Sequence, residues 1–176
     1  MIIGFAGRKR SGKSTAASAL LQLGWQRLSF ADPLRAMLSS LLLDLGLSSD
    51  EIAEAMREKE EVIHPIGRSF RQLAQTLGTE WGRRQVDPDL WIKCAEARLE
   101  ALDGNAVFDD VRFENEATLI RSRGGLIVHI IRPGLDDSDN HASEAGLVVK
   151  EGDVVLDNNS NAGSLLDAVL RLVARI

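Results

Sequence analysis

The chain has 176 residues, of which 44% are hydrophobic and 27% are charged, and its net charge is −5. This length and composition predict a single folded domain and argue against the disordered, fibrous and disulfide-scaffold classes, since Cys94 is the one cysteine. The acidic balance argues against nucleic acid or an anionic membrane as a partner, and because no apolar run is long enough to span a bilayer, we expect a cytoplasmic protein.

The first quarter of the chain alternates between strand and helix patterns. Apolar runs and helical spacing predict strands over 1–6 and 25–30 and helices over 14–23 and 32–45. Asp32 followed by Pro33 is a preferred start for the second of these helices, with Asp32 as its N-cap.

The middle of the chain is predicted to be helical. Helix-prone stretches cover 48–61, 68–81 and 88–102, and Pro65 to Gly67 interrupts the run. We therefore expect one domain in which a helical insertion over about 48–103 is set into a core of about 1–47 and 104–176.

The alternation resumes in the last part of the chain. The sequence predicts strands over 106–110, 126–131 and 153–156, helices over 115–123 and 163–176, and a loop over 133–146. Strands separated by helices imply an α/β fold: a three-layer sandwich with a parallel sheet of about five strands and helices on both faces. Ligands of such folds bind at the carboxyl ends of the strands.

The segment G-R-K-R-S-G-K-S at 7–14 matches every fixed position of the phosphate-loop motif G-x-x-x-x-G-K-[ST]. It lies between a predicted strand and a predicted helix, where backbone amides can hold phosphate oxygens. We expect Lys13 to reach the β- and γ-phosphates of ATP and Ser14 to offer its hydroxyl to Mg²⁺. The residues expected to bind ATP at this loop are Gly7, Arg10, Ser11, Gly12, Lys13, Ser14 and Thr15. Helix packing is an equal account of Thr15.

A magnesium nucleotide site also needs a carboxylate at the end of a neighbouring strand. The predicted strand over 106–110 ends in Asp109 and Asp110, and we assign the metal to Asp110 because Arg112 then lies beside the same crevice. The alternative is that one of these aspartates caps the following helix. Asp32 also ends a strand, but its place before Pro33 fits a capping role equally.

The predicted helix over 68–81 carries a candidate site for a second phosphate group. Arg71 and Gln75 are four residues apart and share one helix face, so one can hold a phosphate while the other reads a base edge. Arg35 and Arg68 could close this clamp. The alternative is that these arginines cover the surface. No lysine follows Asn or Thr, so the guanine-reading N-K-x-D motif of GTPases is absent.

Taken together, these blocks resemble the bacteriophage-type deoxynucleoside monophosphate kinases of the P-loop nucleoside monophosphate kinase group. Besides the phosphate loop, the resemblance is carried by F-A-D-P-L-R at 30–35, R-Q-L-A-Q-T-L-G-T-E at 71–80, Trp91, D-V-R-F-E-N-E-A at 110–117 and H-A-S-E at 141–144. It implies a P-loop kinase that transfers the γ-phosphoryl group of ATP to a deoxynucleoside monophosphate with Mg²⁺ as cofactor. It implies the host cytoplasm as location if the protein is phage-encoded, and leaves a homodimer open.

The resemblance also implies roles for single residues. Arg71 and Gln75 would hold the acceptor phosphate and base, as a similar pair does in adenylate kinases, and Asn158 would contact the donor adenine. The implied substrate-binding set is Asp32, Arg35, Arg68, Arg71, Gln75 and Trp91. For Trp91, core packing is the alternative to stacking on a base. Many family members carry aspartate at the position of Ser14, and serine restores the ordinary metal-binding hydroxyl.

Phosphoryl transfer to a nucleoside monophosphate needs no general base, because that phosphate is mostly dianionic at neutral pH. The residues expected to take part in catalysis are Lys13, Arg71, Arg112 and Asp110. Arg132 precedes the loop over 133–146, which could act as a lid with His141 and Glu144; a solvated loop is the alternative. If this acidic loop closes, Arg121 or Arg123 would have to supply further donors.

Related families keep other functions open. Phosphomevalonate kinases have a similar basic loop, and dephospho-coenzyme A kinases share the overall layout and an ending comparable to 153–158. Neither explains the block at 71–80 as well. A P-loop module that binds ATP as a switch, without transferring phosphate to a small acceptor, is the alternative from another class.

Overall fold

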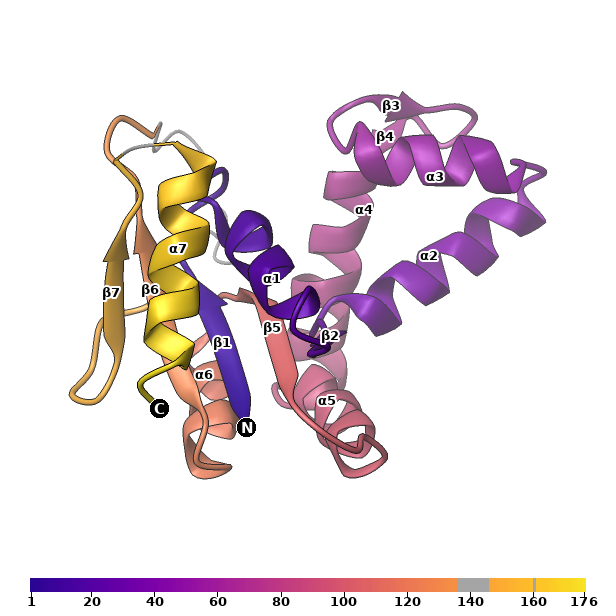
Figure 1. The fold of residues 1–176 in the computed structure, drawn as a ribbon. Coiled ribbons are helices and arrows are strands. Elements are labelled where there is room, and N and C mark those ends of the chain that lie inside the picture. The colour runs from indigo at the N-terminus through magenta and orange to yellow at the C-terminus, as the bar shows by residue number, and fades with distance from the viewer. Residues whose placement is uncertain (136–145, 160) are drawn as a thin grey trace. The chain divides into compact units, whose positions relative to one another are not determined.

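In the computed structural model, which describes residues 1–135, 146–159 and 161–176, the chain forms two units. The first contains Met1–Phe30 and Ala95–Ile176, and the second contains Ala31–Cys94 (Figure 1). No helix in the described ranges is long and apolar enough to cross a membrane.

A parallel sheet forms the centre of the first unit. Its strands, in spatial order, are β2 (Gln26–Leu28), β5 (Ala106–Val111), β1 (Ile2–Ala6), β6 (Leu126–Ile131) and β7 (Val154–Asp157). Every neighbouring pair is parallel. The predicted α/β class is therefore confirmed, and the carboxyl ends of these strands meet at one edge of the sheet.

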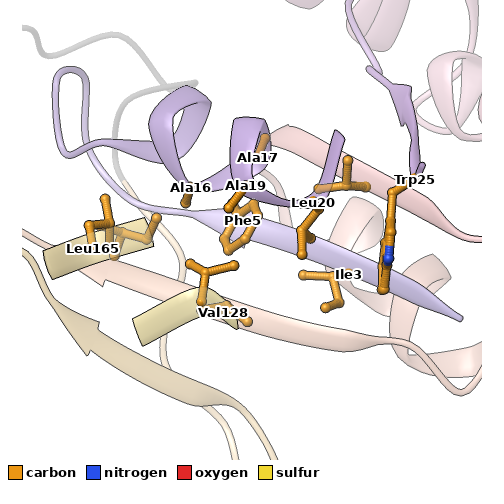
Figure 2. Close-up of a cluster of buried hydrophobic side chains, with 12 residues drawn as sticks. Ile3, Phe5, Ala16, Ala17, Ala19, Leu20, Trp25, Val128 and Leu165 are labelled. Atoms are coloured by element: carbon orange, nitrogen blue, oxygen red, sulfur yellow. The ribbon is translucent and has the colours of Figure 1, made fainter. Parts of the chain in front are cut away.

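Helices cover both faces of this sheet. Helices α1 (Lys13–Leu21) and α7 (Ala162–Val173) lie on one face, and α6 (Glu114–Ser122) lies on the other. Because successive strand residues point to opposite faces, Ile3 and Phe5 pack against α1 and α7 (Figure 2), whereas Gly4 faces α6. A Cβ atom at Gly4 would lie 2.5 Å from Ile120 Cδ1, so only glycine lets α6 pack this closely.

The second unit is mostly helical. Its elements are α2 (Asp32–Asp44), α3 (Ser49–Arg57), the antiparallel pair β3 (Val62–Ile63) and β4 (Arg68–Ser69), α4 (Phe70–Gln75), the π-helix η1 (Thr76–Val86) and the start of α5 (Leu90–Glu100). The unit begins at residue 31, and Leu38 and Leu42 of α2 share a core with Ile52, Ile63 and Phe70.

Local structure in the second unit differs from the prediction at three places. The N-cap of α2 is Ala31, so Asp32 lies in the first turn and not at the cap. The stretch at 65–67, expected as a simple break, is the turn between β3 and β4. The helix predicted over 68–81 is α-helical only from Phe70 to Gln75 and continues as the π-helix η1.

Candidate active site

The loop between β1 and α1 has a backbone conformation that few side chains tolerate. Gly7 and Gly12 have φ angles of 142° and 110°, and Arg10 has a φ of 63°. A Cβ atom at position 7 would lie 2.5 Å from the backbone oxygen of Ile130, so glycine is required there. The Ser11 N–H donates to Arg8 O at 3.1 Å inside the turn. The motif thus forms a tight turn at the N-terminus of α1, an arrangement that binds phosphate oxygens.

Lys13 is held against this loop. Its side chain is buried, and Nζ donates to Gly7 O at 2.6 Å and to Arg8 O at 2.7 Å. These carbonyl groups compensate the cost of burying the ammonium charge. Ser14, the next residue on α1, is exposed, and Thr15 is half-buried. The Ser14 hydroxyl is therefore accessible to a ligand from the first turn of the helix.

Two residues that follow neighbouring strands reach the same loop. Arg132, directly after β6, donates from Nη1 to Arg10 O at 3.4 Å. Asn158, directly after β7, donates from Nδ2 to Ser11 O at 2.8 Å and is buried. The fold thus brings both of these predicted site residues to the phosphate loop, across 122 and 147 positions of sequence.

The two aspartates at the end of β5 have different partners in the first unit. Asp109 is buried and pairs with Arg27, whose Nη2 lies 2.9 Å from Oδ1. Asp110 accepts a short hydrogen bond from Ser29 Oγ and another from the Phe30 N–H at 3.1 Å. Asp110 therefore fixes the last residues of the first unit before the chain enters the second. No signal in the local sequence singled out Ser29 for this contact.

Glu116 accepts backbone hydrogen bonds at the start of α6. Glu116 is buried, and its Oε2 atom accepts from the Arg112 N–H at 2.7 Å and from the Phe113 N–H at 3.0 Å. These bonds satisfy two backbone donors near the helix start. The Arg112 side chain is half-buried directly after β5.

The donors in the first unit are of the type that Mg²⁺ prefers. Among the described residues, no group of three or more His, Cys, Asp or Glu is placed to hold a metal ion. Mg²⁺ in nucleotide sites takes one or two protein oxygens and completes its shell with waters and phosphate oxygens, so the Ser14 hydroxyl and the Asp110 carboxylate fit it. As a ligand, Asp110 would have to share its oxygens with Ser29 and Phe30.

The second unit carries the predicted acceptor residues. The Arg71 side chain, on α4, is 14% exposed, and its Nε atom lies 3.8 Å from Glu60 Oε1. Gln75 follows four residues later on the same helix and is half-buried. Arg35 pairs with Asp32 on α2, with Nη1 2.7 Å from Oδ1. Within this unit, the Arg71 side chain is thus mostly buried but keeps some access to solvent.

Arg68 and Trp91 are the remaining predicted substrate-binding residues, and they differ strongly in exposure. Arg68 is exposed on β4. Trp91 is 2% exposed, and its Nε1 donates to Gly78 O at 2.8 Å. A Cβ atom at Gly82 would collide with the Trp91 ring. The structure therefore gives Trp91 a packing role beneath η1 and leaves its ring no face for a base, whereas the neighbouring Trp81 is 39% exposed.

The remaining predicted residues lie in or near the loop that follows β6. His141 and Glu144 fall outside the described residues. Arg123 lies near two carboxylates of α5, with Nη2 3.4 Å from Glu96 Oε1 and 3.6 Å from Glu100 Oε1. Its guanidinium is thus already engaged in ion pairs.

Arg121 belongs to a charged cluster around the buried carboxylate of Asp153. Arg121 donates to both oxygens of Asp153, from Nε at 3.0 Å and from Nη2 at 2.7 Å, and Nη1 donates to Glu114 at 2.9 Å. His129 Nε2 lies 2.9 Å from Asp153 Oδ2, and the Lys150 N–H donates to the same oxygen at 2.9 Å. The cluster joins the segment before β7 to α6 and β6. Arg121 therefore has a structural role in this unit.

This cluster makes the free energy of unfolding depend on pH in the acidic range. Burial raises the pKa of Asp153, but hydrogen bonds from Arg121, the Lys150 N–H and His129 outweigh it and lower this pKa to about 2. Because the folded pKa lies below the ordinary 3.8, the stabilisation is complete above about pH 5 and is lost as pH falls through 4 toward 2. We expect Asp153→Asn to lower the free energy of unfolding at pH 7 by about 2 kcal/mol and to flatten its decline below pH 4.

Urea unfolding between pH 2 and pH 7 measures this effect. Asp157→Asn, at an exposed position at the end of β7, is the matched control and should stay within about 0.5 kcal/mol of the unsubstituted protein. Equal pH profiles for Asp153→Asn and the unsubstituted protein would show that the cluster carries no such stabilisation.

Comparison with known proteins places this arrangement among kinases. A family model described as deoxynucleotide monophosphate kinase matches residues 44–169. A protein of Acanthamoeba polyphaga mimivirus, named provisionally as a deoxynucleotide monophosphate kinase, is 34% identical over 98% of this chain and 96% of its own length. The deoxynucleotide monophosphate kinase of Enterobacteria phage T4 is 33% identical over 57% of this chain, and the match spans 44% of that protein.

The fold has a relative among solved structures. TT1252 from Thermus thermophilus superposes with a TM-score of 0.53 at 19% sequence identity, covering 100% of this chain and 97% of that one. This likeness concerns the fold alone.

Proposed function

The chain belongs to the deoxynucleotide monophosphate kinase family, and from this premise we propose that it transfers the γ-phosphoryl group of ATP to a deoxynucleoside monophosphate. The products are ADP and the deoxynucleoside diphosphate. The observation that carries the proposal is the buried Lys13 ammonium, held at a glycine-rich turn that opens a helix. In this proposal the enzyme binds two small anionic substrates, ATP and the monophosphate.

The first unit carries the residues that we propose bind the donor. The turn at 7–12 supplies backbone amides for the phosphates, and Lys13 exchanges its loop carbonyl partners for phosphate oxygens when ATP binds. Ser14 and Asp110 would hold Mg²⁺, which screens the phosphate charge when bound. Arg132 lies against the turn, where its guanidinium can approach the phosphates.

The second unit carries the residues that we propose bind the acceptor. Arg71 holds the monophosphate, because a guanidinium can bind two phosphate oxygens at once. Gln75, on the same helix, offers both a donor and an acceptor to a base edge. Arg35 and Arg68 add positive charge for the same phosphate, with Asp32 holding the Arg35 guanidinium at 2.7 Å.

The reaction we propose is a direct in-line transfer. An oxygen of the acceptor phosphate forms a bond to the γ-phosphorus while the bond to the β,γ-bridging oxygen breaks and ADP leaves. The acceptor is already dianionic at neutral pH, so no side chain has to remove a proton. The chain's contribution is to bring two polyanions together and to neutralise the moving charge, with Lys13 at the donor, Arg71 at the acceptor and Arg112 for the transferring group.

The proposal is tested by ADP formation from purified protein with ATP and Mg²⁺, alone and with each deoxynucleoside monophosphate, phosphomevalonate or dephospho-coenzyme A. We expect ADP only when a deoxynucleoside monophosphate is present, together with an equal amount of the diphosphate. ADP release that needs no acceptor would instead identify a switch or motor module, and a response to one of the other acceptors would replace the proposed substrate.

A further inference from the structure

Asn158 joins two strand ends to the phosphate loop. It directly follows β7, the residue is 8% exposed, and its backbone N–H donates to Ile131 O at 2.7 Å. From this anchored position its Nδ2 atom donates to Ser11 O at 2.8 Å. The sheet thus fixes the backbone of Asn158, and the loop fixes its side-chain amide.

This hydrogen bond orients the peptide between Ser11 and Gly12. In a planar trans peptide the carbonyl and the following N–H point in opposite directions. Because Asn158 draws the Ser11 carbonyl toward itself, the Gly12 N–H is directed away from it. Backbone N–H groups at this position of the motif are the groups that hold phosphate oxygens.

Close packing leaves this arrangement little freedom. A Cβ atom at Gly12 would lie 2.7 Å from Asn158 Nδ2 and 2.9 Å from Leu165 Cδ2, so the loop backbone lies directly on the amide and on α7. The loop also contains Arg10 at a φ of 63°, a conformation that costs free energy and needs surrounding contacts to persist. The Asn158 bond is one such contact, at the residue next to Arg10.

We propose that Asn158 is a positioning residue that holds the phosphate loop in the conformation that binds a triphosphate, and that it acts through Ser11 rather than by contacting the base of the nucleotide. This inference rests on the proposed function, in which ATP is the phosphate donor. Asn158 therefore governs affinity for the phosphate chain and not the choice among bases.

The test compares a ligand that has a base with one that lacks it. Asn158→Asp is nearly isosteric but replaces the donating amide by a carboxylate that faces the Ser11 carbonyl. By titration calorimetry we expect it to weaken the binding of inorganic tripolyphosphate and of ATP alike, each about tenfold. In steady-state assays the KM for ATP rises, while the KM for the acceptor and the ratio of ATP to GTP use stay as in the unsubstituted protein.

Asn159→Asp is the matched control, because it introduces the same charge at an exposed neighbouring position; it should leave tripolyphosphate affinity unchanged. Unaltered tripolyphosphate binding with weaker ATP binding in Asn158→Asp would overturn the inference in favour of a base contact, and unaltered binding of both would remove any role. If Asn158→Asp does not fold, Asn158→Ala is measured in the same way. Failure of the unsubstituted protein to bind either ligand would refute the proposed function itself.

Discussion

Replacing Lys13 with alanine is expected to lower kcat roughly a thousandfold. The ammonium group already lies at the phosphate loop, with Nζ 2.6 Å from Gly7 O and 2.7 Å from Arg8 O. In the proposed reaction it neutralises charge that builds up on the β,γ-bridging oxygen, so its loss raises the barrier to transfer more than it weakens ATP binding. Initial rates of ADP formation at saturating ATP and acceptor measure this kcat.

Lys9→Ala is the control for this experiment, since Lys9 is an exposed lysine of the same loop. We expect its kcat to stay within about threefold of the unsubstituted protein, as for an exposed charge screened by solvent. Thermal unfolding of both variants separates lost catalysis from lost folding. A folded Lys13→Ala protein that kept its kcat would contradict the assignment.

Replacing Arg71 with alanine is expected to raise the KM for the deoxynucleoside monophosphate by roughly a hundredfold, with the KM for ATP nearly unchanged. Arg71 lies in the second unit, where its side chain is 14% exposed and its Nε is 3.8 Å from Glu60 Oε1. A charge-assisted, two-pronged bond to phosphate is stronger than a neutral hydrogen bond. Steady-state kinetics with each substrate varied in turn separate the two KM values.

Two further variants sharpen this test. Arg71→Lys keeps the positive charge but loses the planar guanidinium that can bind two phosphate oxygens. We therefore expect its affinity for the acceptor to lie between those of Arg71→Ala and the unsubstituted protein. Arg57→Ala removes an arginine that pairs with Glu54 on α3 and should leave both KM values unchanged. Near-normal acceptor KM in Arg71→Ala would remove Arg71 from the acceptor site and shift attention to Arg35 or Arg68.

The fold of the first unit follows from patterns that lie within short windows of sequence. The strand predicted over 126–131 matches β6 residue for residue, and apolar runs also located β1, β5 and β7 to within one or two residues. The β3–β4 hairpin was missed because strands of two residues are too short to show alternation.

The π-helix η1 was not predicted, and part of what packs against its backbone comes from outside the segment. Gly78 O accepts hydrogen bonds from Trp91 Nε1 and from Arg83 Nη1, at 2.8 and 3.1 Å. Gly82 lacks the Cβ atom that would collide with the Trp91 ring. The contacts with Trp91 involve a residue 13 positions away from Gly78, and the helical spacing of apolar residues within the segment does not predict them.

In the candidate site, features set by adjacent residues were predicted, and contacts between residues far apart in sequence were not. The motif at 7–14 located the phosphate loop, because its glycines and lysine are fixed by conformation and charge at adjacent positions. The partners of Asp110 and Asn158 lie 81 and 147 positions away. Their contacts with Ser29 and Ser11 therefore emerge only when the strands are laid side by side.

Both ends of the segment Ala31–Cys94 join the unit that carries the parallel sheet. Because β2 ends before this segment and β5 begins after it, a change of length or sequence inside it leaves the register of every strand in that sheet intact. In the proposed site this segment binds the monophosphate and the glycine-rich turn binds the triphosphate, so we expect the sequences of relatives to diverge faster within this segment than around the turn.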